Sequence, residues 1–151
     1  MNVIEKINGI TYLDNSKISE SIYSYINNLA IKNFKDLKSI HKTTKNITKC
    51  RRLNPIYINE EIMLVPFYDI NSYDAICINY FNVQSIVIHK NETTVIFIDG
   101  TYRTFMISSY KMHNLMKKAK LVDEYIRIIW LINKKSCIIL LYKPKEKKWK
   151  N

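Results

Sequence analysis

The chain has 151 residues, of which 47% are hydrophobic, with only two glycines and three prolines. This composition excludes a disordered or low-complexity chain and predicts one domain with a sizeable core. Lysine and arginine outnumber aspartate and glutamate by 24 to 13, which gives a net charge of +11. Such a charge favours an anionic partner, which is nucleic acid, an acidic membrane surface or an acidic protein.

Asn8-Gly9 stands between apolar residues near the start of the chain. This pair predicts a small hairpin over residues 3–13, or a strand with a bulge at the glycine. Apolar residues then recur at helical spacing over residues 16–31, with Asn15 or Ser16 as the helix cap. The segment therefore predicts a hairpin followed by an amphipathic helix.

A second helix is predicted over residues 33–49, with Asn33 as its cap. Its apolar positions recur every three to four residues from Phe34 to Ile47, and lysines fill the positions between them. The basic residues of this segment and of the residues that follow it are Lys35, Lys38, Lys42, Lys45, Lys49, Arg51 and Arg52. Such a cluster is either a face that contacts phosphates or an ordinary solvated helix face, and both interpretations stand at this point.

Two short strands are predicted over residues 55–58 and 62–65, with a turn at 59–61 between them. Pro66 ends the second strand at an edge or a bulge, because proline has no N–H to donate to a sheet. A polar loop over residues 67–74 follows.

The centre of the chain, residues 75–109, is expected to form an antiparallel β-meander. Its β-branched and aromatic runs cover residues 76–88 (with a possible break near 81–82), 93–98 and 102–107. The first turn is expected at residues 90–92. Asp99-Gly100 predicts a type I′ turn, in which both central residues have positive φ.

Ser108 or Ser109 is expected to cap a helix that runs to about Leu121, with Lys111, Lys117, Lys118 and Lys120 facing solvent. Beyond it the helix could continue. Alternatively, residues 125–132 and 136–142 could form a hairpin, which their β-branched and aromatic content favours.

The order of elements predicts the α+β class, an antiparallel β-meander with helices packed on one side. We expect one domain over residues 1–143 and a lysine-rich tail over 144–151. No signal peptide and no apolar run of about 20 residues is visible, so no membrane association is expected.

No catalytic motif is recognisable, and with Gly9 and Gly100 as the only glycines no usual phosphate-binding loop is possible. Asp69 and Asp74 could form a metal pair, but such loop residues more often form turns. His113 could be a general base, although exposed helix histidines are common. We therefore expect no enzyme activity.

Cysteine and histidine spacing predicts neither a metal site nor a cofactor. No Cys-x-x-Cys pair occurs among the three cysteines, which are Cys50, Cys77 and Cys137. Cys77 and Cys137 lie within apolar runs and are expected to be buried. Unpaired buried thiols are typical of a reducing, cytoplasmic compartment.

Several short motifs resemble those of one family in their order and spacing. They are Ile7-Asn8-Gly9-Ile10, Thr44, Ile47-Thr48, Pro55-Ile56, Val65-Pro66-Phe67, Ser72, Cys77-Ile78-Asn79-Tyr80 with Val83, Val95-Ile96-Phe97-Ile98-Asp99-Gly100 and Ser108. On these motifs the chain resembles the ComK family of competence transcription factors. It departs from the family where Lys38 to Lys42 replace a Ser-Cys and Gly-Arg signature, and where Cys77 replaces a tryptophan.

The resemblance implies a cytoplasmic activator that binds A/T-rich double-stranded DNA through the minor groove, acts as a homo-oligomer and is controlled by a proteolytic adaptor protein. The narrow groove of A/T-rich DNA attracts arginine and lysine. The residues expected to contact DNA are Arg51 and Arg52 in the groove, Lys38, Lys42, Lys45 and Lys49 on the flanking phosphates, and Arg103 beyond the Asp99-Gly100 turn.

Two other functions remain open from the sequence. One is a protein-interaction module that has lost specific DNA binding. The other is a small nuclease or RNA-binding protein with His113 or Asp69 in its chemistry.

Overall fold

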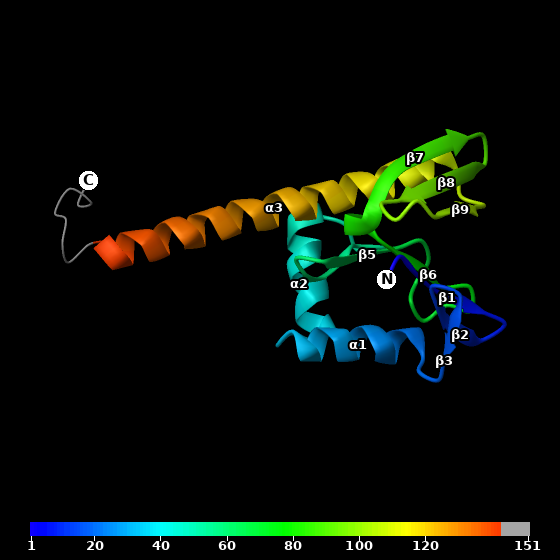
Figure 1. Ribbon diagram of the computed structural model, residues 1–151, viewed down its shortest axis with the longest axis horizontal. Coiled ribbons are helices and arrows are strands. Elements are labelled where there is room, and N and C mark those ends of the chain that lie inside the picture. Colours follow the sequence, from blue (N-terminus) through cyan, green and yellow to red (C-terminus); the bar gives the residue numbers. More distant parts are fainter. Residues whose placement is uncertain (143–151) are drawn as a thin grey trace.

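The computed structural model describes residues 1–142, and the side chains of residues 1–134, as an α+β fold (Figure 1). The first sheet has the strand order β3 (Ser16–Ile18), β2 (Ile10–Leu13), β1 (Val3–Ile7), β6 (Ile76–Asn79), β5 (Ile62–Pro66) and β4 (Ile56–Asn59). The second sheet consists of β7 (Val83–His89), β8 (Glu92–Phe97) and β9 (Tyr102–Phe105). The helices are α1 (Ile22–Lys32), α2 (Leu37–Thr48) and α3 (Ser109–Tyr142). All strand pairs are antiparallel, so the predicted α+β class is confirmed.

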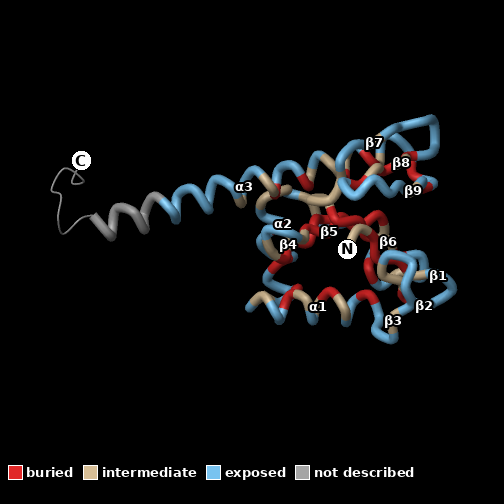
Figure 2. Tube along the Cα trace, viewed as in Figure 1, coloured by how far each residue is buried: buried red, intermediate tan, exposed pale blue. Residues whose placement is uncertain are grey.

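The six-stranded sheet is buried on both faces, because successive residues of a strand point to opposite sides. Ile4 and Cys77 pack with Ile26 and Leu37 in one core, between the sheet and helices α1 and α2. Their neighbours, such as Val3 and Ile78, belong to a second core on the other face. Figure 2 shows the buried residues concentrated in these strands and on the helix faces turned toward them.

The second core joins the six-stranded sheet to the small sheet and α3. Val95 and Phe105 of the small sheet and Met112 and Ala119 of α3 are all buried in it. Helices therefore cover both faces of the larger sheet, with α1 and α2 on one face and α3 on the other (Figure 1). The expectation of helices on a single side holds for α1 and α2 and is wrong for α3.

The Asn8-Gly9 turn joins β1 to β2 as the predicted hairpin, with φ angles of 50° and 78° at the two residues. Asp14 and Asn15 also have positive φ and form a second turn. Residues 16–18 consequently form the edge strand β3, and α1 begins only at Ile22 with Ser21 as its cap. The predicted helix exists, but its start and its cap at Asn15 or Ser16 are wrong.

Helix α2 matches the predicted amphipathic helix over most of its length. It begins at Leu37, and the Asp36 carboxylate caps it by accepting hydrogen bonds from the Ser39 N–H and hydroxyl, each at 2.9 Å. These bonds hold the pKa of Asp36 below its usual value. Asn33 instead ends α1. Phe34, expected on the apolar stripe, lies before the helix and is fully exposed.

The predicted break in the long run is real: a 3-10 turn at Tyr80–Asn82 transfers the chain from β6 in one sheet to β7 in the other. The meander β7-β8-β9 follows as expected. At its second turn only Gly100 has a positive φ, of +87°, and its N–H donates to the Phe97 carbonyl. The turn is thus a three-residue loop with a glycine bulge, and the prediction of a type I′ turn is wrong.

Ser108 caps α3 by accepting a hydrogen bond from the Lys111 N–H at 3.2 Å. The helix then continues without interruption to Tyr142, so the predicted hairpin over residues 125–132 and 136–142 is wrong. No glycine or proline interrupts residues 109–142, and Arg127 pairs with Asp123 one turn earlier. β-Propensity reflects packing within a sheet, and neither sheet formed by the described residues 1–142 includes this segment.

Cys77 is buried as predicted, and burial raises the pKa of its thiol to about 12. Cys50 is partly buried. The side chain of Cys137 and the lysine-rich tail over 144–151 lie outside the described residues.

Candidate nucleic-acid interface

The four lysines predicted from the α2 segment share one exposed side of the helix. Lys38, Lys42 and Lys45 are spaced by four and three residues, which places them one above the other, and Lys49 follows at the C-terminal cap. Lys35, by contrast, leaves this face, because its ammonium donates to the Ile58 carbonyl at 2.6 Å and lies over the Tyr57 ring.

Arg51 and Arg52 lie in the sharp connection between α2 and β4. Lys49 and Leu53 both have positive φ there, which bends the chain back on itself. Asn54, which is 6% exposed, holds the bend together. Its amide donates to the Cys50 carbonyl at 2.8 Å and its oxygen accepts from the Thr48 hydroxyl at 2.6 Å. The two arginines therefore project from a loop whose backbone is fixed by partly buried hydrogen bonds.

Helix α3 supplies two lysines to the same region. The Lys118 ammonium donates to the Arg52 carbonyl at 2.9 Å, and the Lys111 ammonium lies 3.9 Å from the centre of the Tyr68 ring. Partial burial, and secondarily the charge of Arg52, lower the pKa of Lys111. Burial likewise lowers the pKa of Lys118. The sequence interpretation of these two lysines as plain solvent-facing residues is wrong.

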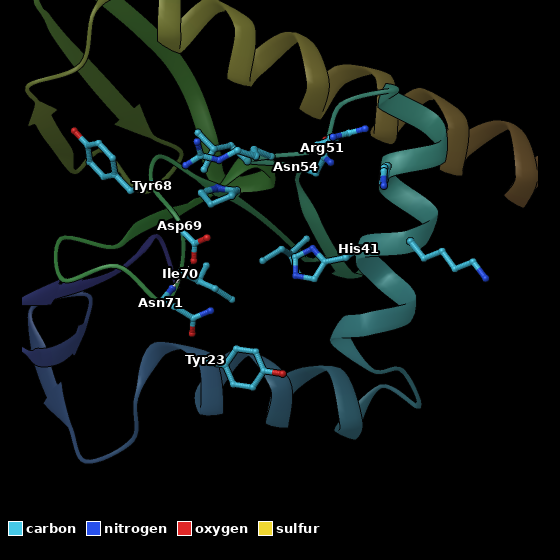
Figure 3. A pocket seen from close by; sticks show the side chains of 14 residues that line it. Tyr23, His41, Arg51, Asn54, Tyr68, Asp69, Ile70 and Asn71 are labelled. Carbon is cyan, nitrogen blue, oxygen red and sulfur yellow. Dashed lines mark hydrogen bonds between the residues drawn. The ribbon is translucent and has the colours of Figure 1, made fainter.

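Helix α2 and the arginine loop border an open cavity of about 530 Å³ (Figure 3). Lys42 and Lys45 line it together with Arg51 and Arg52. In Figure 3, His41 projects into the hollow from α2, Tyr23 borders it from α1, and the loop from Tyr68 to Asn71 forms the opposite wall. The cavity thus brings four of the seven sequence-predicted residues to one place.

Positive charge on this face is not neutralised within the described part of the chain. The ion pairs formed by residues 1–134 use Asp14, Glu5 and Asp123 as their acids, and none of these pairs includes Arg51 or Arg52. Asp69 lines the cavity, but its carboxylate accepts the Asn71 N–H at 2.8 Å as a turn former. The surface therefore offers unpaired guanidinium and ammonium groups to an anion.

Arg103 has a different environment from the other candidates. Its guanidinium donates to Glu5 on β1 at 2.8 Å and lies over the Phe105 ring. The Glu5 side chain is only 7% exposed, so this contact compensates a buried carboxylate. Arg103 joins the small sheet to the large one and does not line the basic cavity.

The candidates for catalysis and metal binding are not supported by the geometry. His113 is exposed on α3, and the residues described contain no group of three His, Cys, Asp or Glu side chains placed to hold a metal ion.

The comparison with models of protein families agrees with the resemblance. The family model described as ComK protein matches residues 12–128, which is most of the chain. The chain belongs to the ComK family. Members of this family are competence-type transcription factors and not enzymes. No curated protein and no solved structure matches the chain significantly.

In the part of the chain that the structure describes, this ComK family member has no helix that is long and apolar enough to cross a membrane. Sequence reasoning missed the environment of Lys111 and Lys118 because their contacts, with the Tyr68 ring and the Arg52 carbonyl, join residues more than 40 positions apart in the chain. Their seven-residue separation, which places both on the same side of α3, was the one available signal.

Proposed function

We propose that this chain is a transcription regulator that binds A/T-rich double-stranded DNA with the surface formed by α2 and the Arg51-Arg52 loop. The observation that supports this most is that Lys42 and Lys45 of α2 and Arg51 and Arg52 of the following loop line one cavity, and that no ion pair among residues 1–134 includes any of the four. A solvated helix face would need only α2, whereas this surface is assembled by tertiary contacts.

The two kinds of cation suit two roles. Arg51 and Arg52 extend from a loop tip with a fixed backbone, and a planar guanidinium fits a narrow groove whose negative potential is high. Lys38, Lys42 and Lys45 rise along about 10 Å of helix and can hold successive phosphates as point charges. In this arrangement the lysines position the protein and the arginines select A/T-rich DNA.

The number of cations determines the salt dependence of binding. Lys38, Lys42, Lys45, Arg51 and Arg52, with Lys49 beside them, amount to five or six phosphate-neutralising groups. Because each releases about 0.9 counterion, log Kd should change with log salt with a slope near 5 in magnitude. Affinity should then fall roughly a thousandfold between about 50 and 200 mM salt.

The test is a titration of matched A/T-rich and G/C-rich duplexes over a salt series. Arg51→Ala/Arg52→Ala should remove the A/T preference and reduce the slope by about 2. Lys17→Ala/Lys32→Ala, which removes two exposed charges away from the cavity, is the matched control and should keep both. Equal affinity for both duplexes at every salt concentration would refute groove reading and favour a protein-interaction module.

A further inference from the structure

The basic cavity changes in character from its bottom to its opening. The residues that line it and are buried are Asn54, Ile56, Pro66 and Ile70, so its floor is mainly apolar. The residues that line it and are exposed include its four cations, Lys42, Lys45, Arg51 and Arg52. The cavity therefore combines an apolar floor with a cationic rim formed by these four residues.

Double-stranded DNA can use the cationic rim but does not fill the floor. A duplex is a stiff, convex rod with a persistence length of about 150 base pairs, so it does not bend into a hollow within one small domain. The cavity volume of about 530 Å³ falls instead in the range of roughly 300–1,000 Å³ that is typical of small-molecule sites. DNA binding thus leaves the floor of the cavity without a partner.

Three side chains from different elements border the hollow above its floor. They are Tyr23 of α1, His41 of α2 and Asn71 of the loop before β6 (Figure 3). In the described part of the chain these side chains make no hydrogen bond, because His41 and Asn71 bond through their backbone carbonyl and N–H. Aromatic rings stack on nucleobases, and an amide bonds to a base edge. This wall therefore has the groups that recognise a nucleoside.

Asp69 gives the cavity a direction. Its carboxylate is the one acidic group among the lining residues, and it stands on the wall opposite α2. One of its oxygens accepts the Asn71 N–H at 2.8 Å, and the carboxylate has further capacity to accept from a ribose hydroxyl or an amino group. Because a carboxylate repels phosphate, an anionic ligand places its nucleoside part near Asp69 and its phosphates near α2 and the arginine loop.

We propose that this cavity binds a nucleoside di- or triphosphate, with its base over the apolar floor and its phosphates on the cationic rim. One phosphate group carries a charge of about −1.5 to −2 at neutral pH. The rim has four cations, none of which belongs to an ion pair within residues 1–134. The rim therefore matches the charge of two or three phosphates better than that of one.

The nucleotide regulates the proposed function, because it occupies Arg51 and Arg52, which the duplex also needs. This regulation rests on the proposed DNA binding, whereas nucleotide binding itself does not. Two ligands that exclude each other weaken each other by the same factor. At a nucleotide concentration about ten times its Kd, the affinity for duplex should fall about tenfold.

The test is calorimetric titration of the full chain at low salt with ATP, adenosine and inorganic tripolyphosphate. ATP should bind about tenfold or more tightly than tripolyphosphate, because only ATP has a base that stacks. Adenosine, which lacks phosphates, should bind more weakly than ATP as well. Duplex titration with and without ATP then measures the competition.

Variants of the wall separate nucleotide binding from generic attraction of anions. Tyr23→Ala and His41→Ala should each weaken ATP binding about tenfold and leave tripolyphosphate binding unchanged. Tyr23→Ala, which lies on α1 outside the DNA-binding surface, should also keep the wild-type affinity for duplex. Tyr110→Ala and His113→Ala are the matched controls, because both remove an exposed ring of α3 that does not line the cavity.

Equal affinity for ATP and tripolyphosphate, or ATP binding that is unchanged in both wall variants, would overturn the inference and leave a surface that attracts any anion. ATP that binds without displacing duplex would overturn the regulation. The two proposals fail separately. A chain that binds duplex but not ATP refutes the nucleotide site alone, and one that binds ATP but not duplex refutes DNA binding alone.

Discussion

Asn54→Ala should both destabilise the protein and weaken its binding to DNA. The side chain is 6% exposed and makes two hydrogen bonds, to the Cys50 carbonyl and from the Thr48 hydroxyl. Each such bond contributes about 0.5–1.5 kcal/mol net, and a buried carbonyl left without a donor costs more. The Thr48 hydroxyl also bonds to the Thr44 carbonyl at 3.0 Å, which limits its loss. We therefore expect a decrease of about 2–3 kcal/mol in the free energy of unfolding.

The effect on DNA follows from the position of Asn54 beneath the arginine loop. Without it, Arg51 and Arg52 must be ordered at the moment of binding, at about 0.5–1.5 kcal/mol for each side chain. The affinity for duplex should consequently fall about tenfold even where the variant is fully folded. Urea denaturation followed by far-UV circular dichroism measures the first effect, and duplex titration well below the unfolding midpoint measures the second.

Asn46→Ala is the control, because Asn46 is exposed on α2 and its replacement removes the same side chain without the loop contacts. Its stability and DNA affinity should stay close to those of the wild type. If Asn54→Ala changed stability by less than about 0.5 kcal/mol, the buried bonds would not hold the loop. If stability fell while DNA affinity stayed unchanged, the loop geometry would be irrelevant to binding.

Two further predictions concern residues away from the basic cavity. Arg103→Met should lower the free energy of unfolding by about 2–3 kcal/mol, because it leaves the buried Glu5 carboxylate without its cation. The same variant should keep its affinity for duplex DNA. A loss of affinity at constant stability would show that Arg103 belongs to the DNA-binding surface. Cys77, whose thiol pKa is raised to about 12 by burial, should resist iodoacetamide at about pH 8 in the folded protein, while the partly buried Cys50 reacts, as peptide mass spectrometry would show. Since an unfolded thiol ionises near pH 8.5, stability should also fall as the pH rises from about 9 toward 12, and less so in Cys77→Val.

Local chemistry was sufficient to predict much of the fold. The Asn8-Gly9 hairpin, the α2 amphipathic helix and the β7-β8-β9 meander each depend on residues close in sequence. Ser16–Ile18 could not be placed in the same way. Its apolar spacing continues that of α1, and only pairing with β2 after the Asp14-Asn15 turn makes it a strand.

The C-terminal half of α3 is the opposite case, in which a segment with strand-like composition forms a helix. Its β-branched and aromatic residues favour strands when averaged over many proteins, but a strand needs a partner, and neither sheet in the described part of the chain offers one to this segment. A helix capped at Ser108, with no internal glycine or proline, satisfies its own backbone hydrogen bonds. Local composition was therefore the wrong guide, and continuity with the preceding helix was the right one.

The residues of the candidate site also differ in whether local sequence could identify them. The α2 lysines and Arg51-Arg52 could be found from the sequence because they lie in one segment and share one helical period. Lys111 and Lys118 could not, because the second core brings α3 against the α2–β4 loop only after folding. Arg103 was a further candidate for DNA contact because it follows the Asp99-Gly100 turn, and its ion pair with the buried Glu5, 98 residues away, could not be predicted from local sequence.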